Sequence, residues 1–392
     1  MSPVLRKEYR ERIRERYKRA NRSKKSSILD EFCAVTNYNR KYAIKLLAKS
    51  PKKKNKYSRP GPARIYTKEV ISVIKVIWLN AEQICSKRLV AALPFWLPFY
   101  EQRYGVIADS VKKKVLAISP ASIDRVLKPT RIKHKKKGLS GTKPGSLLKN
   151  HIPIRTDNWD VTKPGFLEAD TVAHCGNSLE GDFVWSLTMT DIFSHWTENR
   201  AVWNKGSQGV QKAIEDVERA LVFLILGFDC DNGSEFLNWH LWNYFVENRG
   251  QAPVQFTRSR PYHKNDNAHV EQKNYTHVRQ LFGYDRFDNS ELVPLMNGLY
   301  KNEWSAYQNY FLPTMKLVKK ERINSKTKRE HEKMAKTPYQ RLCESNDVSA
   351  EAKAKLKANY SQLNPFLLKQ SIEKKLKIIF NTLLVSSNMS QS

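Results

Sequence analysis

The sequence predicts an α/β domain, a mixed five-stranded sheet with flanking helices, between an all-α region and a basic helical region. Two observations support this fold class. Residues 160–300 alternate between short apolar runs typical of buried strands and stretches of helical period. The charge is also divided, because residues 1–60 carry a net charge of +15 and residues 160–300 carry −7, in a chain of net charge +31. An acidic domain between basic flanks indicates a polyanionic partner, and nucleic acid is the first candidate.

Length and cysteine content indicate the number of domains and the cellular compartment. A chain of 392 residues is expected to hold two or three domains. Its five cysteines form no Cys-x-x-Cys pair, so we expect reduced thiols in a cytoplasmic protein, without a disulfide framework or a zinc module. The Arg- and Lys-rich N-terminus has no apolar signal segment, and the run Ala220–Leu226 is too short to cross a bilayer. No membrane partner is therefore expected.

The N-terminal region predicts DNA-binding helices. Residues 1–25 are interpreted either as a solvated basic helix or arm, or as a DNA contact. Residues 26–49 then show helical spacing, a break at Thr36–Asn39, and a basic second helix carrying Arg40, Lys41 and Lys45. This is the helix-turn-helix plan, although any small helical hairpin would look similar.

Residues 61–130 predict a second helical region. Lys68–Asn80 and Ser86–Arg103 read as helices, the latter interrupted near Pro94. Ser119 and Pro120 are typical of an N-cap and a first helical position, which suggests a second helix-turn-helix over residues 110–127. We expect five regions: residues 1–60, 61–130, a basic linker over 131–159, the core over 160–300 and a basic helical region over 301–392.

The core elements follow one another in a definite order. Three strands come first, then helix, strand, helix, strand and helix, which fits a mixed sheet covered by helices. The expected strands cover 165–172, 183–190, 196–203, 222–228 and 254–257, and the expected helices cover 206–221, 237–248 and 267–282.

Three acidic residues stand near the ends of these elements. Asp170 lies in an apolar run, Asp231 follows the run Leu224–Phe228, and Glu271 lies near the start of a helical stretch. Carboxylates in such places are costly to desolvate, and three that converge would repel one another unless cations lay between them. Oxygen ligands that leave room for water and phosphate suit Mg²⁺ or Mn²⁺.

The order of these residues resembles that of the DDE transposases and retroviral-type integrases, whose core is ribonuclease-H-like. Asp170 stands in FLEADTV, Asp231 in FDCDNGSEF and Glu271 in RPYHKNDNAHVEQKN, with 39 residues between the last two. The basic flanking helices add a resemblance to bacterial insertion-sequence transposases. The resemblance is specific over about residues 160–300, and the histidine–cysteine zinc module of retroviral integrases is absent from the sequence.

The resemblance implies a chemistry and a set of partners. It implies metal-dependent cleavage and strand transfer, with Asp170 bridging two Mg²⁺ (or Mn²⁺) ions and Asp231 and Glu271 each holding one. The implied partners are double-stranded DNA (terminal inverted repeats and target) and further copies of the chain in a homo-multimer, at the bacterial nucleoid. His263, Lys264 and Lys273 would contact DNA near the cleaved bond, or else form a solvated helix face.

Other acidic residues compete for these roles. Glu168 and Asp229 each lie two residues from a predicted ligand, on the same face of a strand. Glu235 is interpreted as a charge at a helix start and Asp266 as an N-cap, while Glu247 is a further rival to Glu271.

Three other functions stay open at this point. A DNA-binding protein descended from a transposase would use the same basic helices without chemistry, and a ribonuclease-H-like nuclease would cut without joining. A transcription regulator would explain residues 1–130 but not the acidic core.

The C-terminal region offers fewer signals. Trp304 and Tyr307 have helical spacing and predict core packing, and residues 316–329 are basic. Thr337–Leu342 resembles a short motif common after this type of core, and residues 350–385 predict helices with Lys-rich faces. No small β-barrel is predicted.

Overall fold

The computed structural model describes residues 3–48, 65–134, 161–231, 233–250, 252–258, 268–323 and 326–389. The chain divides into two compact units, Met1–Ile65 and Tyr66–Ser392. The predicted linkers over 52–62 and 135–159 lie outside the described residues.

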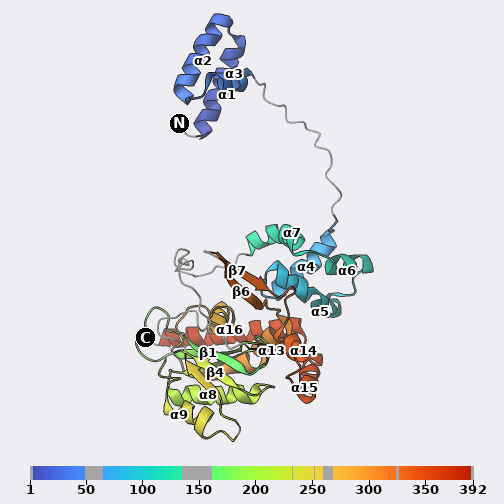
Figure 1. The fold of residues 1–392 in the computed structure, drawn as a ribbon, viewed down its shortest axis with the longest axis vertical. Coiled ribbons are helices and arrows are strands. Elements are labelled where there is room, and N and C mark those ends of the chain that lie inside the picture. Colours follow the sequence, from blue (N-terminus) through green and yellow to red (C-terminus); the bar gives the residue numbers. More distant parts are fainter. Residues whose placement is uncertain are drawn as a thin grey trace. The chain divides into compact units, whose positions relative to one another are not determined.

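Three helices form the N-terminal unit (Figure 1). Their apolar sides meet around Phe32, which is fully buried. Asn21 caps the second helix by accepting a hydrogen bond from the Lys24 amide at 3.0 Å, and Asn37 ends it in a left-handed conformation with φ of 57°. The predicted helix, turn and basic helix are therefore present. The helices are α1 (Pro3–Arg19), α2 (Arg22–Thr36) and α3 (Arg40–Ala48).

Four helices open the second unit. Ser119 caps the last of them, with Pro120 at its start, as the sequence predicted. The predicted interruption near Pro94 is wrong, because one helix runs through both Pro94 and Pro98. Burial of a continuous side that includes Trp96 offsets the two missing amide hydrogens. The helices are α4 (Lys68–Asn80), α5 (Ser86–Tyr104), α6 (Asp109–Leu116) and α7 (Pro120–Lys133).

A mixed five-stranded sheet forms the core, in the order β3-β2-β1-β4-β5. The first three strands are antiparallel neighbours, and β4 and β5 run parallel to β1. This is the predicted ribonuclease-H-like arrangement, with β1 and β4 side by side. The strands are β1 (Phe166–Ala173), β2 (Val184–Asp191), β3 (Thr197–Trp203), β4 (Gly227–Cys230) and β5 (Gln255–Arg258).

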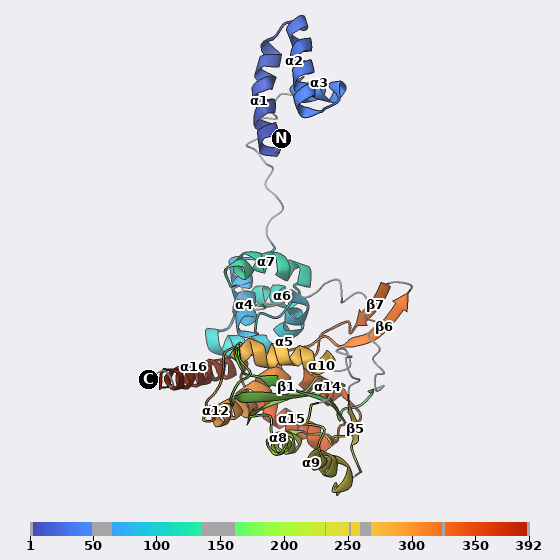
Figure 2. The same ribbon diagram turned by 90° about the vertical axis from the view of Figure 1, so that its left-hand side faces the viewer.

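Alternation along β1 divides its residues between the two faces of the sheet. Leu167 and Ala169 join an apolar cluster with helix α8, which lies with α9 on one side of the sheet (Figures 1 and 2). Glu168 and Asp170 belong to the opposite face, where helix α10 packs. The core helices are α8 (Ser207–Ala220), α9 (Trp239–Trp242) continued by η2 (Asn243–Glu247), and α10 (Ala268–Lys273) continued by η3 (Asn274–Arg279) and α11 (Gln280–Phe282).

The fourth strand begins later than predicted, at Gly227 instead of Val222. Its partner β1 begins at Phe166, which is paired with Gly227, so no strand is available to pair with earlier residues. Val222 and Phe223 instead pack against the larger apolar cluster formed with the helices. Hydrophobicity alone could not distinguish these two uses of one apolar run.

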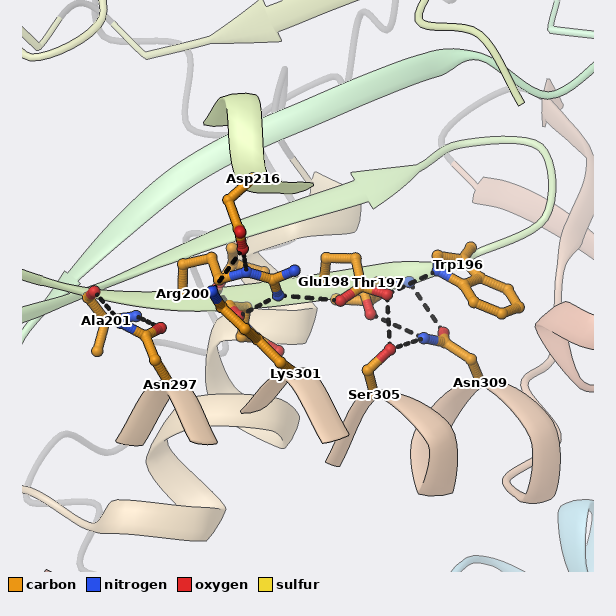
Figure 3. A network of polar contacts seen from close by, with 12 residues as sticks. Trp196, Thr197, Glu198, Arg200, Ala201, Asp216, Asn297, Lys301, Ser305 and Asn309 are labelled. Carbon is orange, nitrogen blue, oxygen red and sulfur yellow. Dashed lines mark hydrogen bonds and ion pairs between the residues drawn. The ribbon is translucent and has the colours of Figure 1, made fainter. Parts of the chain in front are cut away.

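A buried ion network joins β3 to helices on both sides of it (Figure 3). The Arg200 guanidinium lies 3.1 Å from a Glu198 oxygen and 2.5 Å from an Asp216 oxygen. Lys301 also reaches Asp216, at 2.9 Å. Each buried charge therefore has an opposite partner. Amide side chains extend the network, since Asn297 bonds the backbone of Ala201 and Asn309 bonds the backbone of Thr197.

The C-terminal region is helical, with one insertion that the sequence did not predict. Trp304 and Tyr307 are buried as expected, and Thr337 and Gln340 form a capping box. Residues 317–331, however, form a two-stranded antiparallel hairpin. The elements are α12 (Leu292–Gly298), η4 (Leu299–Trp304), α13 (Ser305–Phe311), β6 (Leu317–Ile323), β7 (Lys326–His331), α14 (Pro338–Glu344), α15 (Ala350–Ser361) and α16 (Pro365–Met389). Among the described helices, none is long and apolar enough to span a membrane.

Candidate active site

Strand β1 holds the start of helix α10 through Glu168. This carboxylate is 4% exposed and accepts hydrogen bonds from the amides of His269 and Val270, each at 2.9 Å. A carboxylate at a helix start satisfies amides that have no partner within the helix and complements the helix dipole. Glu168 therefore fixes the helix that carries Glu271 against the strand that carries Asp170.

A second bond ties the same strand to the same helix. Asn274 donates its side-chain amide to Asp170 Oδ2 at 2.6 Å, and the Thr171 amide donates to Asp170 Oδ1 at 2.8 Å. Asn274 lies three residues after Glu271, on a neighbouring part of the helix surface. The sequence interpretation missed Asn274, although this spacing could have identified it.

Asp231 follows the end of β4 directly. Its Oδ1 accepts a hydrogen bond from the Gly233 amide at 2.9 Å, which closes a tight turn. Its rival Asp229 lies within the strand, where Thr257 of β5 donates to it at 2.6 Å. Since β1 and β4 are adjacent and parallel, Asp170 and Asp231 reach the same edge of the sheet.

The charges confirm that these groups lie close together. Burial, together with the nearby charges of Asp231 and Glu271, raises the pKa of Asp170 to about 7. Burial likewise raises the pKa of Glu168 to about 8, with contributions from Asp229 and Glu271. The sequence predicted that Asp170 and Asp231 lie at the same edge of the sheet, and the role of these two residues and Glu271 as metal ligands stays a prediction.

Glu235 lies in the turn ahead of α9, because that helix begins at Trp239 with Asn238 as its N-cap. It is therefore not a charge in the first turn of the helix, as was predicted, and it is 1% exposed. Thr171 donates its hydroxyl to Glu235 Oε1 at 3.1 Å, and Lys205 Nζ lies 2.8 Å from the same oxygen. A Cβ at Gly233 would lie 2.3 Å from Glu235 Oε2, so only glycine leaves room for this carboxylate. Glu235 thus links the Asp231 turn to the residue after Asp170.

The donor set suits a divalent cation of the hard type. The converging side chains offer only oxygen ligands, and burial together with neighbouring carboxylates raises the pKa values of Glu168 and Asp170, a shift that a bound cation would oppose. In the part of the chain that the structure describes, no three His, Cys, Asp or Glu side chains already surround one ion position.

Lys273 lies on the buried side of helix α10. Its side chain is 6% exposed and its ammonium donates to the His195 carbonyl at 3.4 Å. Burial lowers the pKa of Lys273 to about 7, and the charges of Arg88 and Arg341 contribute. It therefore belongs to a cationic cluster beneath the helix, and its contact with DNA stays a prediction.

The other predicted residues fall into two groups. Arg40, Lys41 and Lys45 are exposed on α3, where Arg40 pairs with Asp30 and bonds Ser26 at 2.7 Å. His263, Lys264 and Asp266 lie outside the described residues. Glu247 is exposed and accepts a hydrogen bond from Trp242 at 3.2 Å, which leaves Glu271 as the helical carboxylate near Asp170.

Comparison with known proteins gives one relative of high similarity. The chain is 37% identical over 344 residues to the uncharacterized protein y4rM of Sinorhizobium fredii, covering 84% of this chain and 93% of that one. No protein-family model matches the chain.

Solved structures give weaker similarities, among them three from retroviruses. The HTLV-2 integrase catalytic core in complex with magnesium is 15% identical, covering 38% of this chain and 90% of that one, with a TM-score of 0.28. The BIV integrase catalytic core is 13% identical, covering 50% and 99%, with a TM-score of 0.27. The simian T-cell lymphotropic virus intasome, solved with a PP2A regulatory subunit, is 13% identical, covering 55% and 70%, with a TM-score of 0.33. At such values the function must be argued from the residues of this chain.

Proposed function

The chain belongs to the family of the Sinorhizobium fredii protein y4rM, and we propose that it is a metal-dependent DNA strand-cleaving and strand-joining enzyme, a DDE transposase of a bacterial insertion sequence. The observation that carries the proposal is the convergence of Asp170, Asp231 and Glu271 at one edge of the sheet. The charges of Asp231 and Glu271 help to raise the pKa of Asp170, and a cation bound between the carboxylates would relieve this repulsion.

Each part of the site has a distinct task in this proposal. Asp170, Asp231 and Glu271 would hold the cations. Two Mg²⁺ or Mn²⁺ ions there would activate the attacking hydroxyl and stabilise the charge that develops on the phosphate. Glu168 and Asn274 keep helix α10 in register with β1, so that Glu271 stays beside Asp170. Glu235 holds the Asp231 turn against Thr171.

The basic regions supply the DNA contacts in this proposal. The exposed Arg40, Lys41 and Lys45 of α3 fit the second helix of a helix-turn-helix, which enters the major groove. The terminal inverted repeats of the element would bind there, and the target duplex would approach the acidic edge. Because two ends must be joined to one target, the active form would be a homo-multimer.

The test is strand cleavage and joining on labelled duplexes taken from the DNA that flanks the coding sequence. Wild-type protein with Mg²⁺ or Mn²⁺ is compared with Glu271→Gln, which preserves size and hydrogen bonding but removes the charge. We expect the wild type to cut and join, and the variant to bind DNA with at least about a hundredfold lower rate of cutting. Glu247→Gln is the matched control and should retain wild-type activity, because Glu247 bonds only Trp242 on the exposed surface.

Other results would point to other functions. Cutting without joining would indicate a nuclease, and binding without any reaction would indicate a DNA-binding descendant of a transposase. Equal activity of Glu271→Gln and wild type would contradict the assignment of Glu271.

A further inference from the structure

The hairpin formed by β6 and β7 separates its charges between its two faces. The register sets Lys319 opposite Glu330 and Glu321 opposite Lys328, so on one face each acidic position has a basic position across from it. On the other face Lys320 lies opposite Arg329 and Arg322 lies opposite Thr327, with no acidic position. Alternate positions of a strand belong to one face, so by register positions 320, 322 and 329, which are Lys, Arg and Arg, share that face. We call these three the basic face of the hairpin.

Such a face is unfavourable for the isolated hairpin. Like charges at directly opposed positions of an antiparallel pair destabilise it, and no acidic position on that face offsets Lys320 and Arg329. On the opposite face, by contrast, positions of opposite charge face each other across the strands. A polyanion bound along the basic face would remove the repulsion.

The base of the hairpin is fixed to the catalytic domain. Arg341 donates to the Thr314 carbonyl at 2.8 Å and pairs with Glu332 at 2.7 Å, so it joins the residues before and after the two strands. Lys316 donates to the Phe193 carbonyl at 2.9 Å. Phe193 belongs to the turn between β2 and β3, whose His195 carbonyl accepts from Lys273 on the helix of Glu271.

The strands themselves reach away from this base. Figure 2 shows β6 and β7 extending beyond the helices that surround the sheet. Val318, at the start of β6, is 65% exposed. The hairpin is therefore an extended, two-stranded arm whose base is held by hydrogen bonds to the core domain.

From this register and this fixed base we propose that the β6–β7 hairpin is an arm that binds duplex DNA with its basic face in the major groove. The major groove of B-form DNA is wide enough for a two-stranded β-ribbon, whereas the major groove of A-form RNA is too deep and narrow for one. Residues 317–331 contain no Phe, Tyr or Trp, so the arm lacks the stacking surfaces that single-strand binders use. The inference deepens the proposed function, since it takes duplex DNA as the ligand of the same protein.

The test is the salt dependence of binding to a short mixed-sequence DNA duplex, in EDTA so that no strand is cut. The full-length variant Lys320→Gln/Arg322→Gln/Arg329→Gln removes the basic face. The control Lys319→Gln/Lys326→Gln/Lys328→Gln removes the same charge from the opposite face. We expect the slope of log affinity against log salt to fall by about 3 in the first variant, at about 0.9 for each lost phosphate contact, and to change by less than about 1 in the control.

A second measurement tests the groove. Methylation of guanine N7, which lies in the major groove, should weaken binding by the wild type and the control more than binding by the basic-face variant, whose remaining sensitivity would come from α3. Thermal unfolding should show that the basic-face variant is at least as stable as the wild type, because it loses an opposed like-charge pair.

Several results would overturn the inference. These are an unchanged slope in the basic-face variant, equal losses in both variants, and equal dependence on the basic face when single-stranded DNA or duplex RNA replaces duplex DNA. Failure of the proposed function is distinguishable, because a protein that binds through the arm but never cuts DNA would pass these tests and fail the cleavage assay.

Discussion

Two groups of buried charge in the same domain differ in how they are compensated. Around Arg200, each carboxylate has a basic partner, and Arg200 and Lys301 lower the pKa of Asp216 despite its partial burial (Figure 3). At the edge of β1, burial and neighbouring carboxylates raise the pKa of Asp170 to about 7 and that of Glu168 to about 8. In the first group the charges therefore stabilise one another, whereas the second carries repulsion that a bound cation would relieve.

Removal of Arg200 should have the largest effect on stability. Arg200→Met leaves Glu198 buried without its guanidinium partner, so we expect a loss of about 3–5 kcal/mol in the free energy of unfolding. Urea denaturation measures this change. Arg219→Ala is the control, because Arg219 is exposed and lies 3.7 Å from Asp216, so it should change stability by less than about 0.5 kcal/mol. Similar losses in both variants would mean that burial does not distinguish the ion pairs of this network.

Removal of the Asp170 charge should have the opposite sign. Without metal at pH 8, Asp170→Asn relieves repulsion from Asp231 and Glu271, and its amide can still bond Asn274. We expect Tm to rise, by about 2–4 °C for each kcal/mol of repulsion removed. Scanning calorimetry in EDTA tests this, with Asp288→Asn on the exposed surface as a control. A lower Tm would show that the negative charge of Asp170 is compensated within the fold.

Substitution of Gly233 should disturb the contact by which Glu235 links the Asp231 turn to Thr171. In Gly233→Ala the new Cβ would lie 2.3 Å from Glu235 Oε2, so the buried carboxylate must move away from Thr171. We expect at least about a tenfold loss of strand cleavage with DNA binding unchanged. Gly209→Ala, where a Cβ meets nothing within 4 Å, is the matched control and should preserve activity. Normal cleavage by Gly233→Ala would mean that the position of Glu235 does not matter.

The change of the free energy of unfolding with pH should be smaller than the effects above, and its direction is fixed by the raised pKa values of Asp170 and Glu168. Asp170 and Glu168 have folded pKa values of about 7 and 8, above their ordinary values of 3.8 and 4.5. The folded state therefore binds more protons, and its stability in EDTA should fall as pH rises from about 4 to 8. Added Mn²⁺ should restore more stability at pH 8 than at pH 5, because only the ionised groups bind it. Thermal unfolding across this range gives the answer, and a metal effect independent of pH would contradict it.

The sequence predicted the elements with strong local signals. Lys68–Asn80 was predicted with the bounds that the structure gives, since its apolar spacing and the cap at Thr67 act locally. Asp170, Asp231 and Glu271 could be named as candidates, because each stands near a recognisable end of an element, and their role as metal ligands stays a prediction. The start of β4 was misplaced, since it depends on where β1 begins and not on the apolar run itself.

Other features depend on contacts that no local pattern carries. Burial of Glu235 follows from the absence of a side chain at Gly233 and from the approach of Lys205, which is distant in sequence. The β6–β7 hairpin was missed because charged residues stand on both faces of its strands, so no alternation of apolar and polar residues marks them. The dipeptide Asn324-Ser325 in the sequence is also not a strong hairpin signal. Glycine effects and cross-strand register become visible only in three dimensions.

Direct titration of Mn²⁺ into full-length protein at pH 8, followed by calorimetry, tests the central claim that the acidic edge is a cation site. Wild type is compared with Asp170→Asn and with Glu247→Gln. We predict saturable binding by the wild type and by Glu247→Gln, and its loss in Asp170→Asn, which removes one of the proposed ligands. Saturable binding that survives in Asp170→Asn, or its absence in the wild type, would contradict the account.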